Sequence, residues 1–429
     1  MRILIAGAAG FIGSHIAARL AGEGHEIVAG ARDLAWARVR FPRYRWVEAD
    51  FRKRVNWADH LAGVDAVINC VGVLQDGGAD STRAAHVDGA RALFDACEAA
   101  GVRRVIQISA VGAEAAAGTA YARTKEEGDQ SLMARDLDWV IVKPSLVVAR
   151  GVYGGTALVR GLAGLPFVTP LLATSGQFRP IHMRDLCEAV SRLLRLNAPR
   201  RVVIDAAGPL AQSLPELIAA HRAWLGFGSA RQWTAPHLLT DIAFTVGDML
   251  GAIGVRTSLR STSRAQMAHD VGGDPDSLKR ELSLDVRAGM AALADEPASV
   301  QDRWHARLYF VKPAARLALA TFWILTGIVC LTSGRAEAMA LARAAGLGGL
   351  DALAADGGGL FDIAIGAAFL VLARWRRPLL AIMAAVTLAY ICVLTITLPH
   401  LWSDPLGRLM KLIPFFALLA FVAAVENER

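Results

Sequence analysis

Through the first half of the chain, short apolar runs alternate with segments that repeat their apolar residues every three or four positions. The runs predict strands at 3–6, 26–31, 45–49, 66–71, 104–109 and 139–143, and a later strand at 201–205. The spacing between them predicts helices, among them 13–22, 82–100 and 121–134. Strands about 30 residues apart with helices between them are typical of a parallel sheet that is covered on both faces. The predicted fold class is therefore α/β, with a doubly wound parallel sheet.

The pattern changes after residue 150. Loop-rich stretches are expected at 151–155, 161–166 and 171–176. A helix is predicted at 185–196 with Asp185 as its N-cap, and another at 215–224, entered through a capping box of Ser213 and Glu216. We therefore expect a first domain at 1–150 and a smaller, partly helical lobe at 151–307. The strand near 201–205 would return from this lobe to the sheet.

The last quarter of the chain is dominated by apolar residues. Its four longest apolar runs are 317–331, 360–373, 378–399 and 412–425. Only the third reaches about 20 residues by itself, the length that spans a bilayer as a helix. The others approach this length when flanking small residues and snorkelling cations are included. We therefore predict a four-helix transmembrane bundle at 312–427, and the alternative is a bundle of buried helices in a soluble protein.

Basic residues flank the apolar runs unevenly. Four precede the first run, and Arg374, Arg376 and Arg377 lie between the second and third, whereas the loop 332–358 mixes both signs of charge. Cytoplasmic loops are enriched in Lys and Arg. The expected location is thus the inner (cytoplasmic) membrane, with several spans and the first domain in the cytoplasm. The net charge is +7, but no basic run is interleaved with aromatics, so we expect no nucleic-acid partner. The five cysteines have no metal-ligand spacing, and no metal is expected.

The first eighteen residues contain a glycine motif between a predicted strand and a predicted helix. Gly7, Gly10 and Gly13 follow the apolar residues 3–6 at a spacing of three. In a dinucleotide site, the first glycine permits the tight turn and the second lets the backbone approach the pyrophosphate. The third lets the helix pack closely on the strand. We expect these glycines, with Phe11 and Ile12, to bind a dinucleotide. The alternatives are a glycine-rich turn of another α/β protein or the apolar core of a signal peptide.

The end of the second strand indicates which dinucleotide binds. An NAD site usually has a carboxylate there, but this chain has Ala31 followed by Arg32. A small residue removes the repulsion of a 2′-phosphate and an arginine can pair with it. We therefore expect NADP, with NAD as the alternative because Asp33 follows directly.

Further cofactor contacts are expected at the ends of the next two strands. Asp50 can accept a hydrogen bond from the adenine amino group, and Phe51 can pack beside the ring. A role for Asp50 as a turn cap is equally compatible with its chemistry. Asn69 and Gly72 follow the fourth strand, at the sheet edge where ligands bind in open α/β folds.

Tyr121 and Lys125 are four residues apart and so lie on one face of a predicted helix. A lysine ammonium beside a phenol lowers the pKa of the phenol, which can then act as a general acid or base. The same lysine can bind the cofactor ribose. Ser109, at the end of the fifth predicted strand, can supply a hydroxyl that orients a substrate carbonyl. We predict these three residues to be catalytic.

Together these motifs resemble the extended or atypical short-chain dehydrogenase/reductase superfamily. The nearest branch is that of epimerase/dehydratase-like proteins close to the NADPH-binding accessory subunit of respiratory complex I. The resemblance covers about residues 1–305, and the tail resembles the DoxX-like membrane domain. It implies that Tyr121 is the acid/base, that Lys125 is its partner, and that Pro144 and Ser145 border the nicotinamide. Only Ser109 supplies a hydroxyl in the stretch where active members often have several.

Two functions follow from these observations. The first is a membrane-anchored NAD(P)-dependent oxidoreductase or epimerase that acts on a carbonyl or alcohol of a small, lipophilic molecule. The second is a non-catalytic NADPH-binding structural or assembly protein, with a membrane protein as partner. Two further residues stay open. His182 is interpreted as a histidine at the edge of the core, and Asp362, inside the second apolar run, is either functional or simply reaches the membrane interface.

Overall fold

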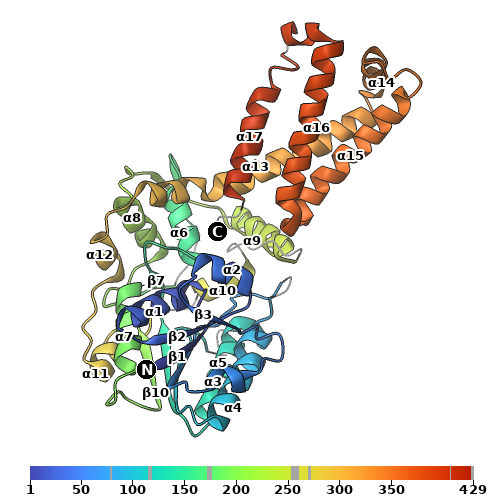
Figure 1. The fold of residues 1–429 in the computed structure, drawn as a ribbon. Helices are drawn as coiled ribbons and strands as arrows, with labels where there is room; N and C mark the ends of the chain where they lie inside the picture. The colour runs from blue at the N-terminus through green and yellow to red at the C-terminus, as the bar shows by residue number, and fades with distance from the viewer. Residues whose placement is uncertain are drawn as a thin grey trace. The chain divides into compact units, whose positions relative to one another are not determined.

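The computed structural model of the chain describes residues 1–77, 80–114, 118–171, 176–252, 260–268, 272–405 and 407–426. The chain forms two compact units, Met1–Arg307 and Leu308–Arg429 (Figure 1). The first unit is built on a parallel sheet, and the second consists of helices.

Seven parallel strands form the sheet of the first unit. They are β1 (Arg2–Ala6), β2 (Glu26–Ala31), β3 (Arg45–Glu48), β4 (Ala66–Asn69), β5 (Arg104–Ile108), β6 (Asp138–Pro144) and β10 (Val202–Ala206). Their order is β10-β6-β5-β4-β1-β2-β3, with β1 paired to both β2 and β4. The predicted parallel sheet is therefore confirmed. The strand predicted at 66–71 ends at Asn69, so the residues that follow it form a loop at the sheet edge.

Helices cover both faces of this sheet (Figure 1). One face packs against α1 (Phe11–Gly22), α2 (Leu34–Arg40), α7 (Met183–Leu193) and α11 (Ser277–Leu282). The other packs against α3 (Trp57–Leu61), α4 (Gly89–Ala99) and α5 (Ala120–Met133). Side chains alternate along a strand, so Ile3 and Ile5 enter the first core and Leu4 and Ala6 the second. This two-sided burial explains why the strands are continuous apolar runs.

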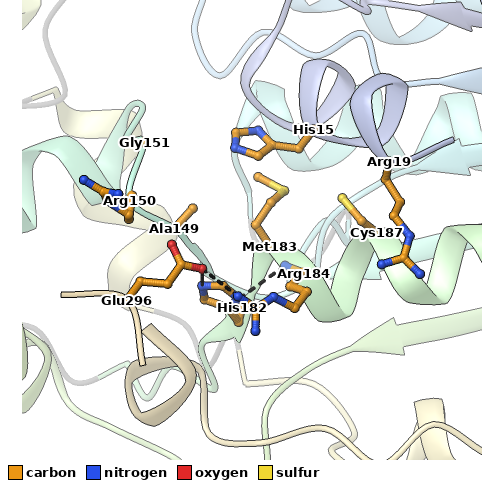
Figure 2. A pocket seen from close by; sticks show the side chains of 10 residues that line it. All are labelled: His15, Arg19, Ala149, Arg150, Gly151, His182, Met183, Arg184, Cys187 and Glu296. Carbon is orange, nitrogen blue, oxygen red and sulfur yellow. Dashed lines mark hydrogen bonds and ion pairs between the residues drawn. The ribbon is translucent and has the colours of Figure 1, made fainter. Parts of the chain in front are cut away.

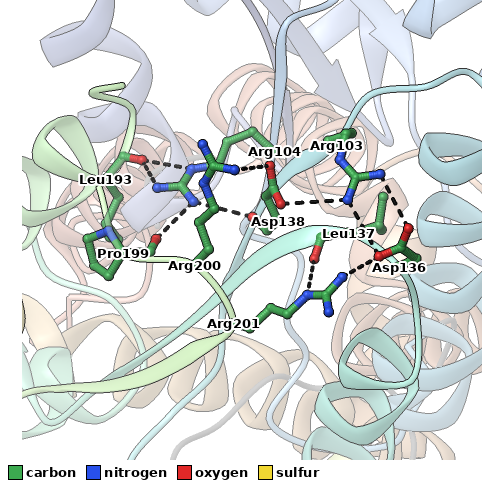
Figure 3. A network of polar contacts seen from close by, with 9 residues as sticks. All are labelled: Arg103, Arg104, Asp136, Leu137, Asp138, Leu193, Pro199, Arg200 and Arg201. Atoms are coloured by element: carbon green, nitrogen blue, oxygen red, sulfur yellow. Dashed lines mark hydrogen bonds and ion pairs between the residues drawn. The ribbon is translucent and has the colours of Figure 1, made fainter. Parts of the chain in front are cut away.

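Arginine side chains form hydrogen bonds around the amino ends of β5 and β6 (Figure 3). Arg104 Nε donates to the carbonyl oxygen of Leu193 at 2.8 Å, and its Nη1 donates to that of Pro199 at 2.9 Å. Arg201 has a φ of 53°, which is unusual outside glycine, and its side chain bonds Asp136 and Leu137. These contacts join the end of α7 and the start of β10 to the sheet edge opposite the glycine motif.

The remaining elements of the first unit form a smaller lobe. They are β7 (Val147–Val148), α6 (Gly155–Ala163), β8 (Val168–Leu171), β9 (Ile181–His182), α8 (Leu214–Trp224), β11 (Arg231–Thr234), α9 (His237–Ala252), α10 (Ser261–Ala268) and α12 (Gly289–Ala294). The predicted capping box of α8 is present, and the backbone N–H of Ser213 donates to Glu216 at 2.7 Å. The predicted loops at 151–155 and 161–166 are partly wrong, because α6 buries an apolar face and packs on α8.

The start of α7 also differs from the prediction. The helix begins at Met183, and its N-cap is His182, whose Nδ1 accepts from the backbone N–H of Arg184 at 3.3 Å. Asp185 lies in the first turn instead of capping it. Most of the predicted loop 171–176 lies outside the described residues.

The second unit contains α13 (Val300–Leu331), which starts at the end of the first unit, and then α14 (Arg335–Ala344), α15 (Asp351–Val371), η3 (Ala373–Trp375), α16 (Arg376–Thr397), η4 (Pro399–Ser403) and α17 (Leu412–Val425). Three helical segments in the described chain are long and apolar enough to cross a membrane: α13, α15 and η3–α16. The fourth predicted run forms α17, which has 14 residues and so a length of about 21 Å, less than a hydrocarbon core of about 30 Å. The predicted loop 332–358 is wrong, because it contains α14 and the first turns of α15.

Candidate functional site

The predicted site residues lie at the carboxyl edge of the sheet. The strand order reverses beside β1, because the chain leaves β1 for β2 and β3 on one side and returns to β4 on the other. Ligands of open α/β sheets bind outside the carboxyl ends at this switch point. The glycine motif follows β1, Asn69 ends β4, Ser109 follows β5 and Pro144 ends β6, so all four meet at one edge.

The glycine loop has the geometry that a dinucleotide needs. Gly7 has a φ of 79°, which a side chain would strain, and a Cβ on Gly13 would lie 2.3 Å from the Gly7 carbonyl oxygen. The first turn of α1 includes Phe11 and Ile12 and contains no acidic residue. Its N-cap is Gly10, and no described side chain accepts a hydrogen bond from the amides of this turn. These amides and the helix dipole suit a pyrophosphate. The residues present therefore fit NAD(P).

Directly after β2, the predicted cofactor residue Arg32 and its neighbour Asp33 already have partners. Arg32 Nη1 donates to Asp80 Oδ1 at 2.6 Å, and Asp33 caps α2 by accepting from the backbone N–H of Trp36 at 3.0 Å. A 2′-phosphate could pair with Arg32 only in competition with Asp80. Using Asp33 for an NAD ribose would cost the cap of α2.

Asp50 lies at the carboxyl end of β3 and faces Arg52. Arg52 Nε and Nη2 donate to the two carboxylate oxygens at 2.7 and 2.6 Å. These bonds hold the pKa of Asp50 below its usual range, so its carboxylate stays an acceptor. Phe51 is buried against Trp57, with ring centroids 5.8 Å apart, and contributes to the core.

A buried amide pair lies between β4 and β5. Asn69 Nδ2 donates to Gln107 Oε1 at 2.8 Å, and Asn69 Oδ1 accepts from the backbone N–H of Val71 at 3.1 Å. This second bond shapes the loop that leads to Gly72. A Cβ on Gly72 would lie 3.6 Å from Lys125 Nζ, so this glycine brings the loop against the predicted catalytic lysine.

Tyr121 and Lys125 lie in the first two turns of α5, which Thr119 caps by accepting from the backbone N–H of Ala122 at 3.0 Å. Lys125 is buried, and its Nζ donates to the Ile108 carbonyl oxygen at 2.9 Å, at the end of β5. This bond places the ammonium at the sheet edge, beside Gly72. The structure therefore brings the predicted tyrosine and lysine to the end of β5.

The predicted effect of Lys125 on Tyr121 is wrong in this structure. Burial raises the pKa of the Tyr121 phenol to about 12, and the nearby charge of Asp129 adds to the shift. Burial also lowers the pKa of Lys125, against the opposing charges of Asp129 and Cys70. The local cost of charge in a buried site outweighs the attraction that the sequence argument considered. The phenol is consequently protonated at neutral pH.

Ser109 is the third predicted catalytic residue, and it is paired with a residue that sequence reasoning missed. Its hydroxyl donates to Asp129 Oδ2 at 2.5 Å, and both side chains are buried. Burial raises the pKa of Asp129, although Ser109, Lys125 and Lys143 favour its charged form. Asp129 lies four residues after Lys125, and this spacing on one helix face was the signal that could have revealed it.

His86 is a second missed residue. It lies in a π-helical turn, Ala84–Asp88, that precedes α4, and its ring contacts Tyr121 edge-on with centroids 5.5 Å apart. Its Nε2 accepts from the backbone N–H of Val73 at 3.0 Å, so Nδ1 carries the hydrogen and donates to Thr124 Oγ1 at 2.9 Å. Burial lowers the pKa of His86 to about 2. The neutral imidazole therefore positions both the Gly72 loop and the tyrosine.

Pro144 and Ser145 lie at the carboxyl end of β6, next to β5. The Pro144 carbonyl oxygen accepts from the backbone N–H of Val111 at 3.0 Å. Ser145 Oγ accepts from the backbone N–H of Arg179 at 3.3 Å, which joins this strand end to the smaller lobe. Both residues are thus at the sheet edge where the family resemblance expects the nicotinamide.

A separate pocket of about 250 Å³ lies between α1 and the start of α7 (Figure 2). None of its ten lining residues belongs to the predicted catalytic or cofactor set. His182, 3 % exposed, contributes Nε2, which is 3.7 Å from Glu296 Oε1 and has no hydrogen-bond partner among the described residues. His182 is therefore both a buried core-edge side chain, as interpreted from the sequence, and the cap of α7.

Comparison with known families agrees with this geometry. Residues 7–161 match the NAD(P)H-binding family, and residues 320–420 match the DoxX-like family. The chain therefore combines an NAD(P)-binding domain with a Rossmann-like parallel sheet and a C-terminal DoxX-like domain. The match and the three apolar helices also make it a membrane protein with about three candidate spans.

Two curated relatives can be named. The chain is 29 % identical to ceramide reductase of Caulobacter vibrioides over 185 residues, which are 43 % of this chain and 57 % of the relative. It is 25 % identical to sterol demethylase protein B of Methylococcus capsulatus over 332 residues, 71 % of this chain and 99 % of the relative. The match to the reductase thus spans little more than half of that protein.

Solved structures show the same fold at low sequence identity. UDP-glucuronic acid 4-epimerase of Bacillus cereus, in complex with UDP-glucuronic acid and NAD, superposes with a TM-score of 0.52. The superposition covers 70 % of this chain and 98 % of the epimerase, at 16 % identity. At this identity the likeness establishes the fold of the first unit and nothing about its substrate.

Proposed function

We propose that this protein is a membrane-anchored NAD(P)-dependent oxidoreductase that reduces a carbonyl group of a lipophilic substrate. The observation that supports this most directly is geometric: Tyr121 and Lys125 lie in the first two turns of α5, and Lys125 Nζ bonds the Ile108 carbonyl at the carboxyl end of β5. A protonated phenol is the form that donates a proton to a carbonyl oxygen as it becomes an alcohol.

Bound NAD(P)H supplies the hydride of this reaction. The chain's own residues then have separate tasks. Tyr121 Oη donates its proton to the substrate oxygen, and the Lys125 ammonium, held by the Ile108 carbonyl, stabilises the phenolate that forms. The Ser109 hydroxyl donates its hydrogen bond to Asp129, so toward the substrate it offers an oxygen lone pair, which suits the hydroxyl product better than the ketone.

For the cofactor, we propose NADPH over NADH. Ala31 ends β2 without a carboxylate, Arg32 follows it, and Asp33 is engaged as the cap of α2. The 2′-phosphate would displace Asp80 from Arg32. Replacing Arg32 with Ala should weaken NADPH binding by about tenfold or more while changing NADH binding little, because a charge-assisted hydrogen bond is lost.

The lipophilic character of the substrate is inferred from the membrane segments and from the names of the two relatives, which concern a ceramide and a sterol. We also propose that the first unit faces the cytoplasm, where nicotinamide cofactors are available. Three basic residues support this orientation through the positive-inside rule: Arg374, which lies between α15 and α16, and Arg376 and Arg377, which begin α16.

The deciding experiment compares Tyr121→Phe with Tyr153→Phe in the full chain, assayed in detergent with NADPH and a panel of long-chain and sterol ketones. Tyr153 is 58 % exposed and serves as the matched control. We expect Tyr121→Phe to lower turnover by about 10²- to 10⁴-fold with unchanged nucleotide affinity, since it removes only the acid. Unchanged turnover would refute the role of Tyr121.

The alternative function, a non-catalytic NADPH-binding protein of a membrane complex, rests on the engagement of Ser109 by Asp129. It predicts a different result in cells. Tyr121→Phe would then preserve the cellular function, while a bulky residue at Gly10 would abolish it together with nucleotide binding.

A further inference from the structure

Among the described residues of the second unit, Asp362 is an acid that lies inside an apolar helix. Asp362 lies in the middle of α15 and is 6 % exposed. Its Oδ1 is fully buried and has no hydrogen-bond partner in the part of the chain that the structure describes. Buried charged side chains are normally paired, so an unpaired one needs an explanation.

The position of Asp362 is set by close contacts between α13 and α15 on either side of it. A Cβ on Gly327 would lie 2.3 Å from the Gly359 carbonyl oxygen, three residues before Asp362. A Cβ on Gly366, four residues after it, would lie 2.9 Å from the Ala320 carbonyl oxygen. Residues 359, 362 and 366 share one helix face, so Asp362 is enclosed in the seam between the two helices.

Three arginines on the helices of the second unit are engaged with acids other than Asp362. Arg316 of α13 and Arg376 of α16 bond Glu426 at 2.8 and 3.3 Å. Arg335 of α14 bonds Asp356 of α15 at 2.7 Å. Each of these arginines therefore already neutralises a carboxylate other than Asp362.

The ionisable groups that face Asp362 are not cations either. Cys330 on α13 and Tyr390 on α16 lie close enough to interact with it electrostatically. Both are neutral acids in their ordinary state and cannot balance a carboxylate. The helix α17, Leu412–Val425, contains no ionisable residue. A proton is thus the positive charge that Asp362 can obtain locally.

We propose that Asp362 is a proton-binding site of the membrane unit, a carboxyl group that takes up and releases a proton between α13, α15 and α16. Burying an unpaired carboxylate between apolar helices has a high free-energy cost, and such a group becomes neutral by binding a proton. This site is independent of the proposed reductase chemistry, because each of its neighbours belongs to the second unit.

The test uses dicyclohexylcarbodiimide, an apolar reagent that adds to a protonated carboxyl group and rearranges to a stable N-acylurea. The full-length protein in lipid vesicles is treated at pH 6, 7, 8 and 9, and the labelled residues are located by mass spectrometry. We expect label on Asp362 at pH 7, at least about tenfold above that on Asp356, and a decrease toward pH 9. Asp356, on the same helix but paired with Arg335, is the internal control for an ionised acid.

Two further variants make the result decisive. Asp362→Asn must abolish the label, and Glu426→Gln, which removes a buried but paired acid, must leave it unchanged. A maleimide of similar size on Cys330 reports whether apolar reagents reach the seam. Label on Cys330 with none on Asp362 at any pH would overturn the proposal, as would equal label on Asp362 and Asp356. Failure of reductase activity in any of these variants would bear on the proposed function and not on this site.

Discussion

Asp129 in the sheet unit and Asp362 in the membrane unit are both buried aspartates on long helices, but their surroundings differ. Asp129 accepts a short hydrogen bond from Ser109 and lies near the charges of Lys125 and Lys143. Asp362 lies in a helix seam with no described hydrogen-bond partner. The first is part of a network that holds the predicted catalytic side chains, and the second is proposed to depend on a proton from outside.

The difference shows what each environment does with a buried acid. At the sheet edge, strands that end together supply hydroxyl, amide and ammonium donors within reach of one helix. Between apolar helices the backbone is already hydrogen-bonded within each helix, so side chains are the remaining donors. Removing a partner should therefore destabilise the first unit, whereas neutralising the lone acid should not destabilise the second.

The largest effect is expected where a glycine permits close backbone contact, and each unit has such a position. A Cβ at Gly13 or at Gly327 would lie 2.3 Å from a carbonyl oxygen. Gly13→Val should prevent the glycine loop from forming and abolish the rise in melting temperature that NADPH produces, because overpacking against backbone has no simple relief.

Gly327→Val should instead separate α13 from α15 and leave the NADPH-dependent rise unchanged. Differential scanning fluorimetry of the full chain in detergent, with and without NADPH, measures both. Gly22→Val is the matched control, because a Cβ there meets no atom within 4 Å. Loss of the NADPH response in Gly327→Val would mean that the two regions are not independent.

The next largest effect should come from Asp129→Ala, which leaves the Ser109 hydroxyl and the Lys125 ammonium buried without their acceptor and counter-charge. We expect a loss of about 3 kcal/mol, or about 6 °C or more in the transition that NADPH stabilises. Asp129→Asn keeps an oxygen acceptor for Ser109 and should lose about half as much. Equal losses in the two variants would show that the negative charge of Asp129 matters, and that neither its hydrogen bond to Ser109 nor its volume does.

Much of the fold could be predicted because its signals are local. The six strands from β1 to β6 are short apolar runs that end in polar or small residues, and the glycine motif after β1 sets the place of the dinucleotide site. Helix α6 was missed because its sequence, Gly155–Ala163, is flanked by glycines, and its apolar face is stabilised only by packing on α8. The short α14 was missed because its small and charged residues resemble a loop.

The place of the predicted site residues at one sheet edge follows from the sequence, but the shifts of their pKa values do not, and their roles stay predictions. Tyr121, Lys125 and Ser109 are brought to one sheet edge, but the pKa of Tyr121 depends on how deeply α5 buries it. Asp129 and His86 act through contacts with residues 20 and 38 positions away in the sequence. The partners in these contacts depend on which strand lies beside which helix, which a local pattern does not report. The spacing of Asp129 from Lys125 indicates only that the two share a helix face.

A moderate effect is expected from acid. The folded protein keeps His86 neutral, since burial lowers its pKa to about 2, whereas the unfolded chain protonates it below about 6.5. The contribution of His86 to the free energy of unfolding is therefore fully present above pH 6.5. It decreases as the pH falls, by about 2 kcal/mol between pH 6.5 and 5. Buried His221, whose pKa is lowered to about 4, adds in the same direction. Denaturant titrations at pH 6.5 and 5, on the protein and on His86→Gln, measure how much of this pH dependence comes from His86. If the unfolding free energy of the variant falls equally with pH, His86 does not contribute.

The smallest effect on stability should come from Asp362→Asn, and a small effect would support a neutral Asp362 in the folded protein. If Asp362 is held as the neutral acid, the amide replaces one uncharged group by another of nearly equal volume, and no described hydrogen bond is lost. At neutral pH, the stability of the membrane unit should then change by less than about 0.5 kcal/mol, which its melting temperature measures. As the pH rises and the acid ionises, the variant should become the more stable protein, because the acid then carries an unpaired buried charge that the amide never has. A variant that is destabilised by more than about 2 kcal/mol at pH 7 would show instead that Asp362 makes a strong bond there, and the contrast with Asp129 would disappear.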